Sequence, residues 1–192
     1  MKQFSQNDVT VVKKEVVFQG YFRMLKYYFT HALFSGGTSK IVERELFERD
    51  TAVAVIPYDP VRDQIVMVEQ IRVGAFGHDI SPWMIELVAG MIEERELADD
   101  VAKRELKEET GLDCQRLDKI MSYLVSPGGT SECIELYVAE VDASQALAIA
   151  GLECESEDIR TTVMDVSDAI EHLSQSKFQN GVTIVGLQWL AL

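Results

Sequence analysis

The sequence predicts an α+β fold in which a mixed β-sheet lies between layers of helices. Three observations predict it. Short β-branched and apolar runs fill the chain before residue 90, one long helical segment covers 97–110, and further strands then precede two terminal helices. This order lacks the regular alternation of a parallel βαβ array. The 192 residues, 47% of them hydrophobic, suffice for one domain, or for one domain with a small appendage.

The expected strands come first along the chain. Apolar, β-branched and aromatic residues are concentrated at 9–12, 16–18, 21–34 and 41–47, and further apolar runs cover 51–56, 64–68 and 83–89, the last ending at Gly90. A Ser-Gly-Gly turn follows residue 34, and Asp59 and Pro60 mark another turn. We expect a strand-rich N-terminal segment, 1–45, followed by the main domain, 46–192.

The expected helices begin at residue 97. The segment 97–110 carries a sparse apolar face that includes Val101 and Leu106, and Gly111 suits the left-handed position just after a helix. Strands are expected around 120–125 and 134–141. Ser167 is expected to cap the first terminal helix and Asn180 the second, because both side chains can accept a hydrogen bond from a free backbone N–H.

Composition and charge exclude several classes of protein. The 18 Lys and Arg residues against 32 Asp and Glu residues give a net charge of −14, which opposes binding to nucleic-acid phosphates. No apolar run approaches the roughly 20 residues of a membrane span, and the N-terminus lacks the apolar stretch of a signal peptide. Cys114, Cys133 and Cys154 are widely spaced and odd in number, unlike a disulfide framework. We expect a cytoplasmic protein without nucleic-acid or membrane partners.

One helical segment concentrates carboxylates. Glu105, Glu108 and Glu109 stand at i, i+3 and i+4, so they share a face and repel one another. A hard divalent cation such as Mg²⁺ would neutralise them, and it commonly bridges carboxylates to substrate phosphates. An acidic chain could bind a phosphate-rich ligand in this way. For these three residues alone, a solvated acidic helix face is the alternative.

The wider pattern resembles the signature of Nudix hydrolases, in which spaced glycines frame Glu, Arg-Glu and Glu-Glu positions. All nine positions match: Gly90, Glu96, Arg104, Glu105, Leu106, Glu108, Glu109, Gly111 and Leu112. The resemblance implies the Nudix fold, a mixed sheet between helices. It also implies hydrolysis of a pyrophosphate that links a nucleoside to another moiety.

The resemblance assigns the acidic positions to metal binding. Glu105 and Glu109 match the core metal ligands, Glu108 matches a frequent additional ligand, and the carbonyl of Ala89 matches another. Two or three Mg²⁺ ions, or Mn²⁺ ions, are implied for each active site.

Four other positions match structural parts of the signature. Arg104 and Glu96 match a pair that orients the carboxylates, and Gly90 lets the backbone bend tightly. Gly111 matches the second glycine of the signature, near its end.

Other features are similar to the ADP-ribose pyrophosphatase subgroup. Pro127 follows Gly111 at a spacing of 16 residues, and a Glu-Gln-Ile-Arg sequence ending at Arg72 follows a strand. The resemblance extends over nearly the whole chain and implies cleavage of ADP-ribose to AMP and ribose 5-phosphate. Two alternatives stay open, a hydrolase of another nucleotide sugar such as a GDP-sugar, and a Nudix-like sensor that binds a nucleotide without cleaving it.

The subgroup resemblance also implies residues that bind the substrate. Arg72 would hold the diphosphate through charge-assisted hydrogen bonds. Glu132 matches a residue that contacts the terminal ribose, and Gly129 lies in a loop that permits close backbone approach. Phe29 and Arg44 match positions around the adenine, although core packing is the alternative for Phe29.

A second acidic cluster occupies 151–160 and is expected to form a loop before a strand. The subgroup carries its general base and a further metal ligand at this place. Glu155 is assigned as the base and Glu157 as the metal ligand, with the reverse assignment open and a solvated acidic loop as the alternative.

The N-terminal segment is long for a simple appendage. In the resembling subgroup such a segment exchanges across a homodimer, so that Phe29 would act in the partner's adenine site.

Overall fold

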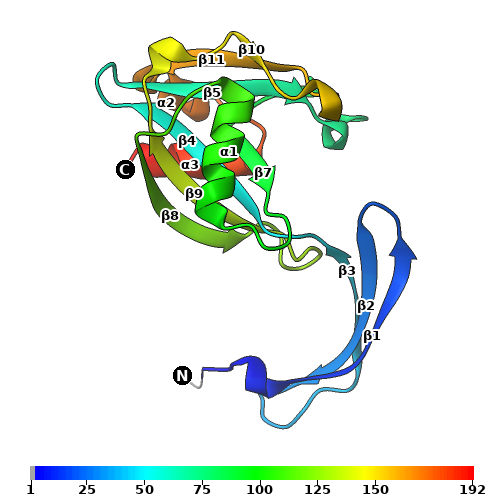
Figure 1. Ribbon diagram of the computed structural model, residues 1–192. Helices are drawn as coiled ribbons and strands as arrows, with labels where there is room; N and C mark the ends of the chain where they lie inside the picture. The colour runs from blue at the N-terminus through cyan, green and yellow to red at the C-terminus, as the bar shows by residue number, and fades with distance from the viewer. Residues whose placement is uncertain (1–2) are drawn as a thin grey trace. The chain divides into compact units, whose positions relative to one another are not determined.

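The computed structural model describes residues 3–192, apart from the side chain of Glu155. The chain divides into two compact units. The first unit runs to Asp50 and includes Leu124–Glu132, and the second comprises Thr51–Tyr123 and Cys133–Leu192. Figure 1 follows the chain through its elements.

The first unit is built on a three-stranded antiparallel sheet. After a 3-10 turn, η1 (Gln6–Asp8), the strands β1 (Val9–Gln19), β2 (Arg23–His31) and β3 (Val42–Glu48) pair in the order β1-β2-β3. The expected runs 9–12 and 16–18 belong to one strand, whose pairing with β2 shifts register twice. Leu25 is the only buried hydrophobic residue among those described in this unit, whereas Val16 and Phe18 are exposed. The sheet therefore has little core of its own.

The second unit contains a mixed sheet. Its strands are β4 (Ala52–Asp59), β5 (Gln64–Ile71), β6 (Trp83–Glu86), β7 (Val88–Met91), β8 (Arg116–Leu124), β9 (Cys133–Glu140), β10 (Ile149–Ala150) and β11 (Ile159–Asp165). The main order is β10-β11-β5-β4-β9-β8, with β6 on β5 and β7 on β4. The β4–β9 pair is parallel, while β5 is antiparallel to both β4 and β11.

The central strands β4 and β5 separate soon after their connecting turn. They pair only at Tyr58–Ile65 and Asp59–Gln64, and β7 and β6 then take over as their partners. The expected single run over 83–89 is wrong, because the chain forms two strands separated by Leu87. The Leu87 N–H donates to the hydroxyl of Thr183 instead of to a strand. Gly90 does not end this segment but lies within β7, opposite Val53.

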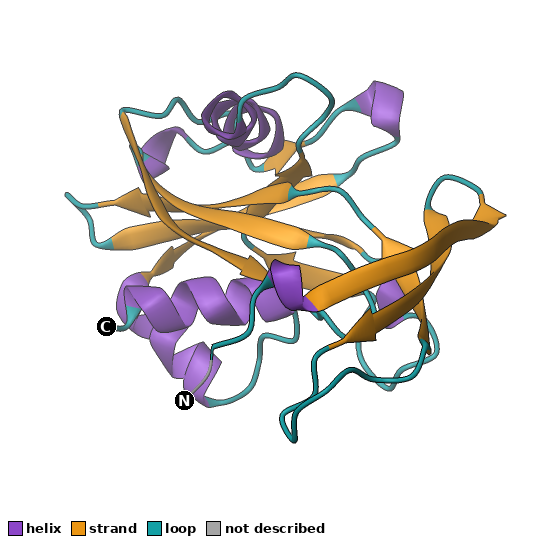
Figure 2. Ribbon diagram, turned by 90° about the horizontal axis from the view of Figure 1, so that it is seen from below, coloured by secondary structure: helices purple, strands orange, loops and turns teal. Residues whose placement is uncertain are grey.

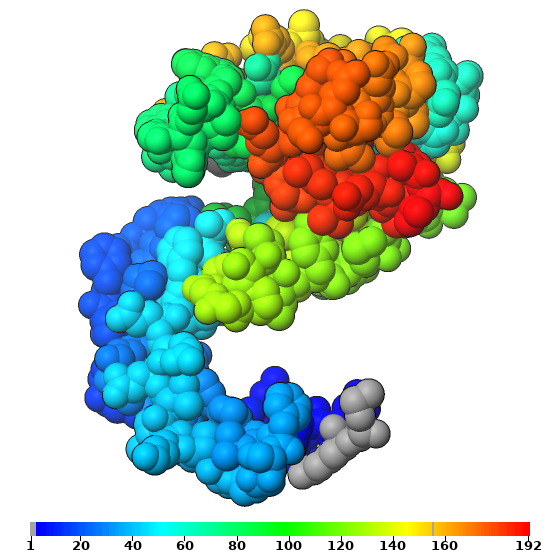
Figure 3. Space-filling model, turned by 180° about the vertical axis from the view of Figure 1, so that it is seen from behind, coloured from blue at the N-terminus to red at the C-terminus, as the bar shows by residue number. Residues whose placement is uncertain are grey.

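Helices cover both faces of the sheet, as Figure 2 shows. Val53 of β4 and Leu106 of α1 (Ala98–Thr110) belong to one buried apolar cluster. Ile56 of β4 and Leu187 of α3 (Gly181–Leu190) belong to another, which also includes α2 (Val166–Ser174). Alternate residues of a strand face opposite sides of the sheet, so β4 contributes side chains to both apolar clusters. Figure 3 shows α2 and α3 side by side, in orange and red. The expected α+β fold, a mixed sheet between helices, is confirmed.

The helix ends follow the expected signals in two of three cases. Gly111 adopts φ 75° after α1, and the Asn180 side chain accepts a hydrogen bond from Thr183 N at the start of α3. The expected cap at Ser167 is wrong, because β11 runs directly into α2 and Asp165 occupies the cap position. The remaining 3-10 turns are η2 (Val73–Ala75), η3 (Ala143–Gln145) and η4 (Glu153–Glu155). Among residues 3–192, no helix combines the length and apolarity of a membrane span.

Candidate active site

The motif helix lies against the backbone of β7 at Gly90. A Cβ atom at this position would overlap the carboxylate of Glu105, so a glycine is needed here for close approach. Glu105 is thereby held largely out of solvent beside the strand.

Glu109 is the most deeply buried carboxylate of the motif, with 2% of its surface exposed. Its Oε2 accepts a hydrogen bond of 3.2 Å from Ala89 N, and its Oε1 accepts one of 3.2 Å from Gln70 Nε2. These bonds join α1 to β7 and to β5, the two strands beside the opening of the sheet. Burial raises the pKa of Glu109 to about 8, although the bond from Ala89 opposes the shift.

Glu105 shares this environment. Burial raises its pKa to about 7, Arg104 opposes the shift, and the charges of Glu108 and Glu157 add to it. Glu105 also raises the pKa of Glu109. The structure therefore brings the carboxylates at 105, 108, 109 and 157 within electrostatic reach of one another.

Arg104 offsets part of this negative charge. Its Nη1 lies 2.8 Å from Glu105 Oε1 and 3.0 Å from Glu108 Oε2, and its Nε lies 3.5 Å from Glu96 Oε1. Glu96 in turn accepts a hydrogen bond from Glu93 N. The guanidinium thus connects the loop before α1 to two carboxylates of the helix.

The acidic loop before β11 is attached to the same helix. Gly151 N donates to the carbonyl of Glu108 at 3.1 Å, and Glu157 Oε2 accepts a bond of 3.3 Å from Leu152 N. Gly151 adopts φ 97°, which favours glycine. Glu155 falls in η4, and its side chain, the expected general base, lies outside the described residues.

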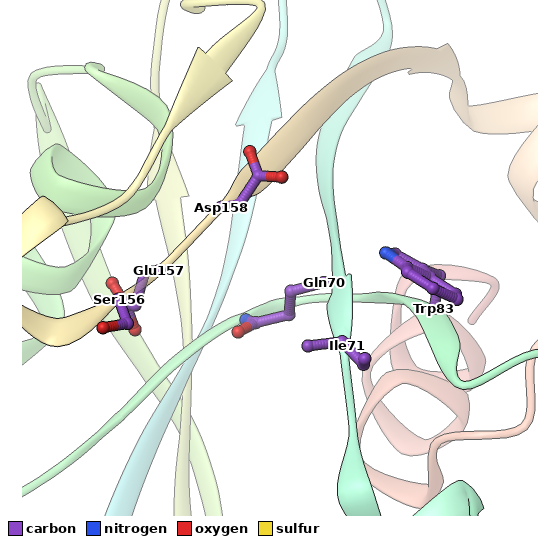
Figure 4. Close-up of a pocket in the computed structure, with 6 residues that line it drawn as sticks. All are labelled: Gln70, Ile71, Trp83, Ser156, Glu157 and Asp158. Carbon is purple, nitrogen blue, oxygen red and sulfur yellow. The ribbon is translucent and has the colours of Figure 1, made fainter.

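A cavity of about 330 Å³ opens beside these carboxylates. Its lining comprises Gln70, Ile71, Trp83, Ser156, Glu157 and Asp158, which Figure 4 shows around the end of β5. Gln70 points toward Ser156 and Glu157, and it is also the residue that donates to Glu109. The cavity therefore extends from Glu157 and Asp158 to the exposed indole of Trp83, and Gln70 connects its lining to Glu109.

Arg72 follows β5 at this opening. Its Nε donates to Glu86 Oε2 at 2.8 Å, and its positive charge lowers the pKa of Glu109. Its two terminal nitrogens have no hydrogen-bond partner among the described residues, which exclude the side chain of Glu155. Arg72 is therefore a cation beside the buried carboxylates, with donors available for an anion.

Sequence reasoning missed Glu86 and gave Asn180 only a capping role. Glu86 is buried, and it accepts bonds from both Arg72 and Asn180. One signal could have found it, since an acidic residue interrupts the otherwise apolar run 83–89.

Phe29 and Arg44, expected around the adenine, belong to the first unit. Phe29 pairs with Val42 and Arg44 pairs with Tyr27, so Phe29 and Arg44 share one face of the three-stranded sheet. Arg44 Nη1 donates to the carbonyl of Glu43. The structure thus brings these two residues to one surface.

Glu132 and Gly129 also belong to the first unit. Glu132 Oε1 lies 2.9 Å from Arg49 Nη2, and the Gly129 carbonyl accepts a bond of 2.8 Å from Phe47 N. The Arg49 guanidinium stacks over the ring of Phe22, which fixes the partner of Glu132.

The donor set of the motif suits a hard divalent cation. Its donors are all oxygens, and the pKa values of Glu105 and Glu109 are raised, chiefly by burial and further by neighbouring carboxylates. In the part of the chain that the structure describes, no three His, Cys, Asp or Glu side chains converge as a complete metal site. Mg²⁺ commonly uses one or two carboxylates and takes its other ligands from water and phosphates, so this arrangement fits it.

Comparison with known proteins identifies the family of the chain. A model of the NUDIX domain matches residues 48–183. ADP-ribose pyrophosphatase of Escherichia coli K12 is 46% identical over 98% of this chain and 90% of that protein, and that of Haemophilus influenzae is 42% identical over 100% and 90%. A crystal structure described as ADP compounds hydrolase shares the fold, with a TM-score of 0.72 at 20% identity over 98% of this chain and 97% of that one. The family model spans the mixed sheet and the carboxylate helix, and the chain belongs to the Nudix hydrolase family.

Proposed function

We propose that the chain hydrolyses the diphosphate of ADP-ribose and releases AMP and ribose 5-phosphate. The observation that carries the proposal is a buried carboxylate, Glu109, and a half-buried one, Glu105, near the guanidinium of Arg72. The terminal nitrogens of that guanidinium have no hydrogen-bond partner among the described side chains. Carboxylates with raised pKa values beside a cation are concentrated at functional sites, and a cation that also binds phosphate would neutralise them. The similarity to ADP-ribose pyrophosphatases over nearly the full chain supports the choice of ADP-ribose.

Two or three Mg²⁺ or Mn²⁺ ions would be held by the motif. The ligands would be Glu105, Glu108, Glu109, Glu157 and the carbonyl of Ala89. When bound, such ions supply positive charge that neutralises phosphate oxygens and acidifies a water. Arg104 and Glu96 would hold the carboxylates in position, and Gly90 would leave room for Glu105.

The protein's own side chains would supply proton transfer and orientation. Glu155 would accept the proton of the attacking water, as a general base in the loop that also carries Glu157. Arg72 would hold the diphosphate. The reverse assignment of Glu155 and Glu157 predicts that Glu157→Gln, and not Glu155→Gln, removes the ionisation of the base from the pH profile of kcat.

The first unit would complete the site. Phe29 and Arg44, on one face of the sheet, would stack on adenine, while Glu132 and Gly129 would contact the terminal ribose. We propose that residues 1–45 form a dimerisation segment, exchanged between two copies, and that 46–192 form the hydrolase domain. Exposed apolar side chains on β1, such as Val16 and Phe18, support this because a partner would cover them. A reducing cytoplasm suits the free cysteines of the described chain.

The test is a panel of nucleotide sugars assayed with the purified protein and Mg²⁺. ADP-ribose should give AMP with the highest kcat/KM, and EDTA should abolish the reaction. A higher kcat/KM for a GDP-sugar would favour the alternative substrate. Tight binding of ADP-ribose without any product would instead favour a nucleotide sensor.

A further inference from the structure

Glu86 is a carboxylate whose burial needs an explanation. It ends β6 with 3% of its surface exposed, in a strand of otherwise apolar residues. A buried charge is unfavourable unless charged or polar partners compensate for it. Glu86 has two such partners, Arg72 on Oε2 at 2.8 Å and the amide of Asn180 on Oε1 at 2.5 Å.

The contact with Arg72 uses only one edge of the guanidinium. Glu86 takes the Nε–H, which fixes the plane of the group, and the terminal nitrogens remain without partners among the described residues. Arg72 also lowers the pKa of Glu109, so the guanidinium lies within electrostatic reach of that carboxylate. A planar guanidinium with a free pair of N–H donors matches two oxygens of a phosphate.

The contact with Asn180 comes from the far end of the chain. Asn180 caps α3, where its Oδ1 accepts from Thr183 N at 3.1 Å and its Nδ2 donates to Glu86. Since the amide oxygen and nitrogen have different partners, the orientation of the side chain is fixed. A separate bond, from Leu87 N to the Thr183 hydroxyl, joins α3 to the sheet without involving the Glu86 carboxylate.

We propose that Glu86 and Asn180 are positioning residues that orient Arg72 toward the diphosphate of the substrate. The inference rests on the proposed function, in which Arg72 binds that diphosphate. The cap of α3 holds the Glu86 carboxylate, and that carboxylate holds the guanidinium. A C-terminal helix that contributes nothing directly to the carboxylate cluster thereby sets the geometry of substrate binding.

The first test separates positioning from folding. Asn180→Ser keeps an oxygen that can cap α3 but removes the amide donor to Glu86. We expect kcat/KM for ADP-ribose to fall on the order of tenfold, chiefly through KM, because Arg72 loses its orientation. Thr183→Val is the matched control, since it removes the bond to Leu87 N without touching the Glu86 carboxylate. It should lower Tm and leave KM within about twofold. A KM unchanged in Asn180→Ser, or raised equally in Thr183→Val, overturns the proposal.

The second test asks whether Asn180 acts through Arg72. In an Arg72→Ala background, Asn180→Ser should have no further effect on KM. If the two residues acted independently, the fold-changes in KM of the two single variants would multiply in the double variant. The Kd of ADP-ribose is also measured by calorimetry for the wild type, the two single variants and the double variant. These measurements are made in EDTA, where no hydrolysis is expected. Equal effects of Asn180→Ser in both backgrounds contradict the inference. A wild-type chain that binds ADP-ribose but cleaves no nucleotide sugar refutes the proposed function, while the Kd cycle still decides the positioning role.

Discussion

The carboxylate of Glu109 accepts a hydrogen bond from the backbone N–H of Ala89, 3.2 Å away. This single contact ties the last turn of α1 to β7. It also places a titratable group of high pKa next to Ala89, the residue whose carbonyl we propose as a metal ligand.

Replacing Glu109 by Gln should remove activity while preserving the fold. Gln keeps the size of the side chain and an acceptor for Ala89 N, but it removes the negative charge that would bind the cation. We expect AMP release from ADP-ribose to fall by about 100-fold or more. Metal-free Glu109→Gln should melt at or above the wild-type Tm at pH 8, because no buried charge forms. Unaltered turnover would exclude Glu109 as a metal ligand.

The stability of the metal-free protein should depend on pH in a defined direction. The pKa values of Glu105 and Glu109 are raised by folding from 4.5 to about 7 and about 8, so the folded state holds more protons than the unfolded state between pH 4.5 and 8. Their stabilising contribution is complete below pH 4.5 and is lost as the pH rises through 7 and 8. Tm measured in EDTA should therefore fall over this range more steeply than in Glu109→Gln. Saturating Mg²⁺ should raise Tm more at pH 8.5 than at pH 5.5, and an equal rise at both values would contradict the assignment.

Gly90→Ala should displace Glu105. The added Cβ would overlap the carboxylate, and the side chain must leave its place against β7. We expect at least about a tenfold loss in kcat/KM, the scale seen when groups supporting a metal site are disturbed. Gly181→Ala is the control, because its Cβ would meet nothing within 4 Å. Circular dichroism should show that both variants are folded, and a fully active Gly90→Ala protein would refute the steric argument.

Asp59 should stabilise the fold without affecting catalysis. It is buried, and burial alone would raise its pKa, but hydrogen bonds from Ala143 N, Arg62 N, Arg62 Nη1 and Val61 N outweigh burial and lower the pKa. Its contribution is therefore present above pH 3.8 and is lost as the pH falls through the lower folded pKa. Asp59→Ala should reduce the free energy of urea unfolding at pH 7 by about 2–4 kcal/mol. KM for ADP-ribose should not change.

The proposed dimer can be tested by substituting exposed apolar residues of β1. Light scattering should give twice the mass of one chain for the wild type. Val16→Glu with Phe18→Glu places two charges on the exposed apolar surface of this strand and should give a monomer. If Phe29 acts in the partner's site, the monomer should also show a raised KM for ADP-ribose. A monomeric wild type with full activity would reject the exchange.

The sequence predicted the fold class and the motif because both depend on local patterns. Apolar runs located β4 and β5, and the spacing of acidic residues placed Glu105 and Glu109 on one face of α1. The split of 83–89 into β6 and β7 could not be predicted, because it depends on the hydrogen bond from Leu87 to Thr183 of a distant helix. Glu86 was missed for a similar reason, since its two partners lie far from it in the sequence.

The parallel pairing of β4 with β9 also constrains how the protein is made. These strands stand on either side of α1 in the chain, so the central ladder closes only after most of the second unit has left the ribosome. Such non-local pairing slows folding. The β1–β2 hairpin, by contrast, is formed from neighbouring segments and emerges before the second unit, with apolar side chains still exposed. During synthesis the nascent chain therefore carries an aggregation-prone hairpin before its carboxylate cluster exists, a period in which chaperone binding would be useful.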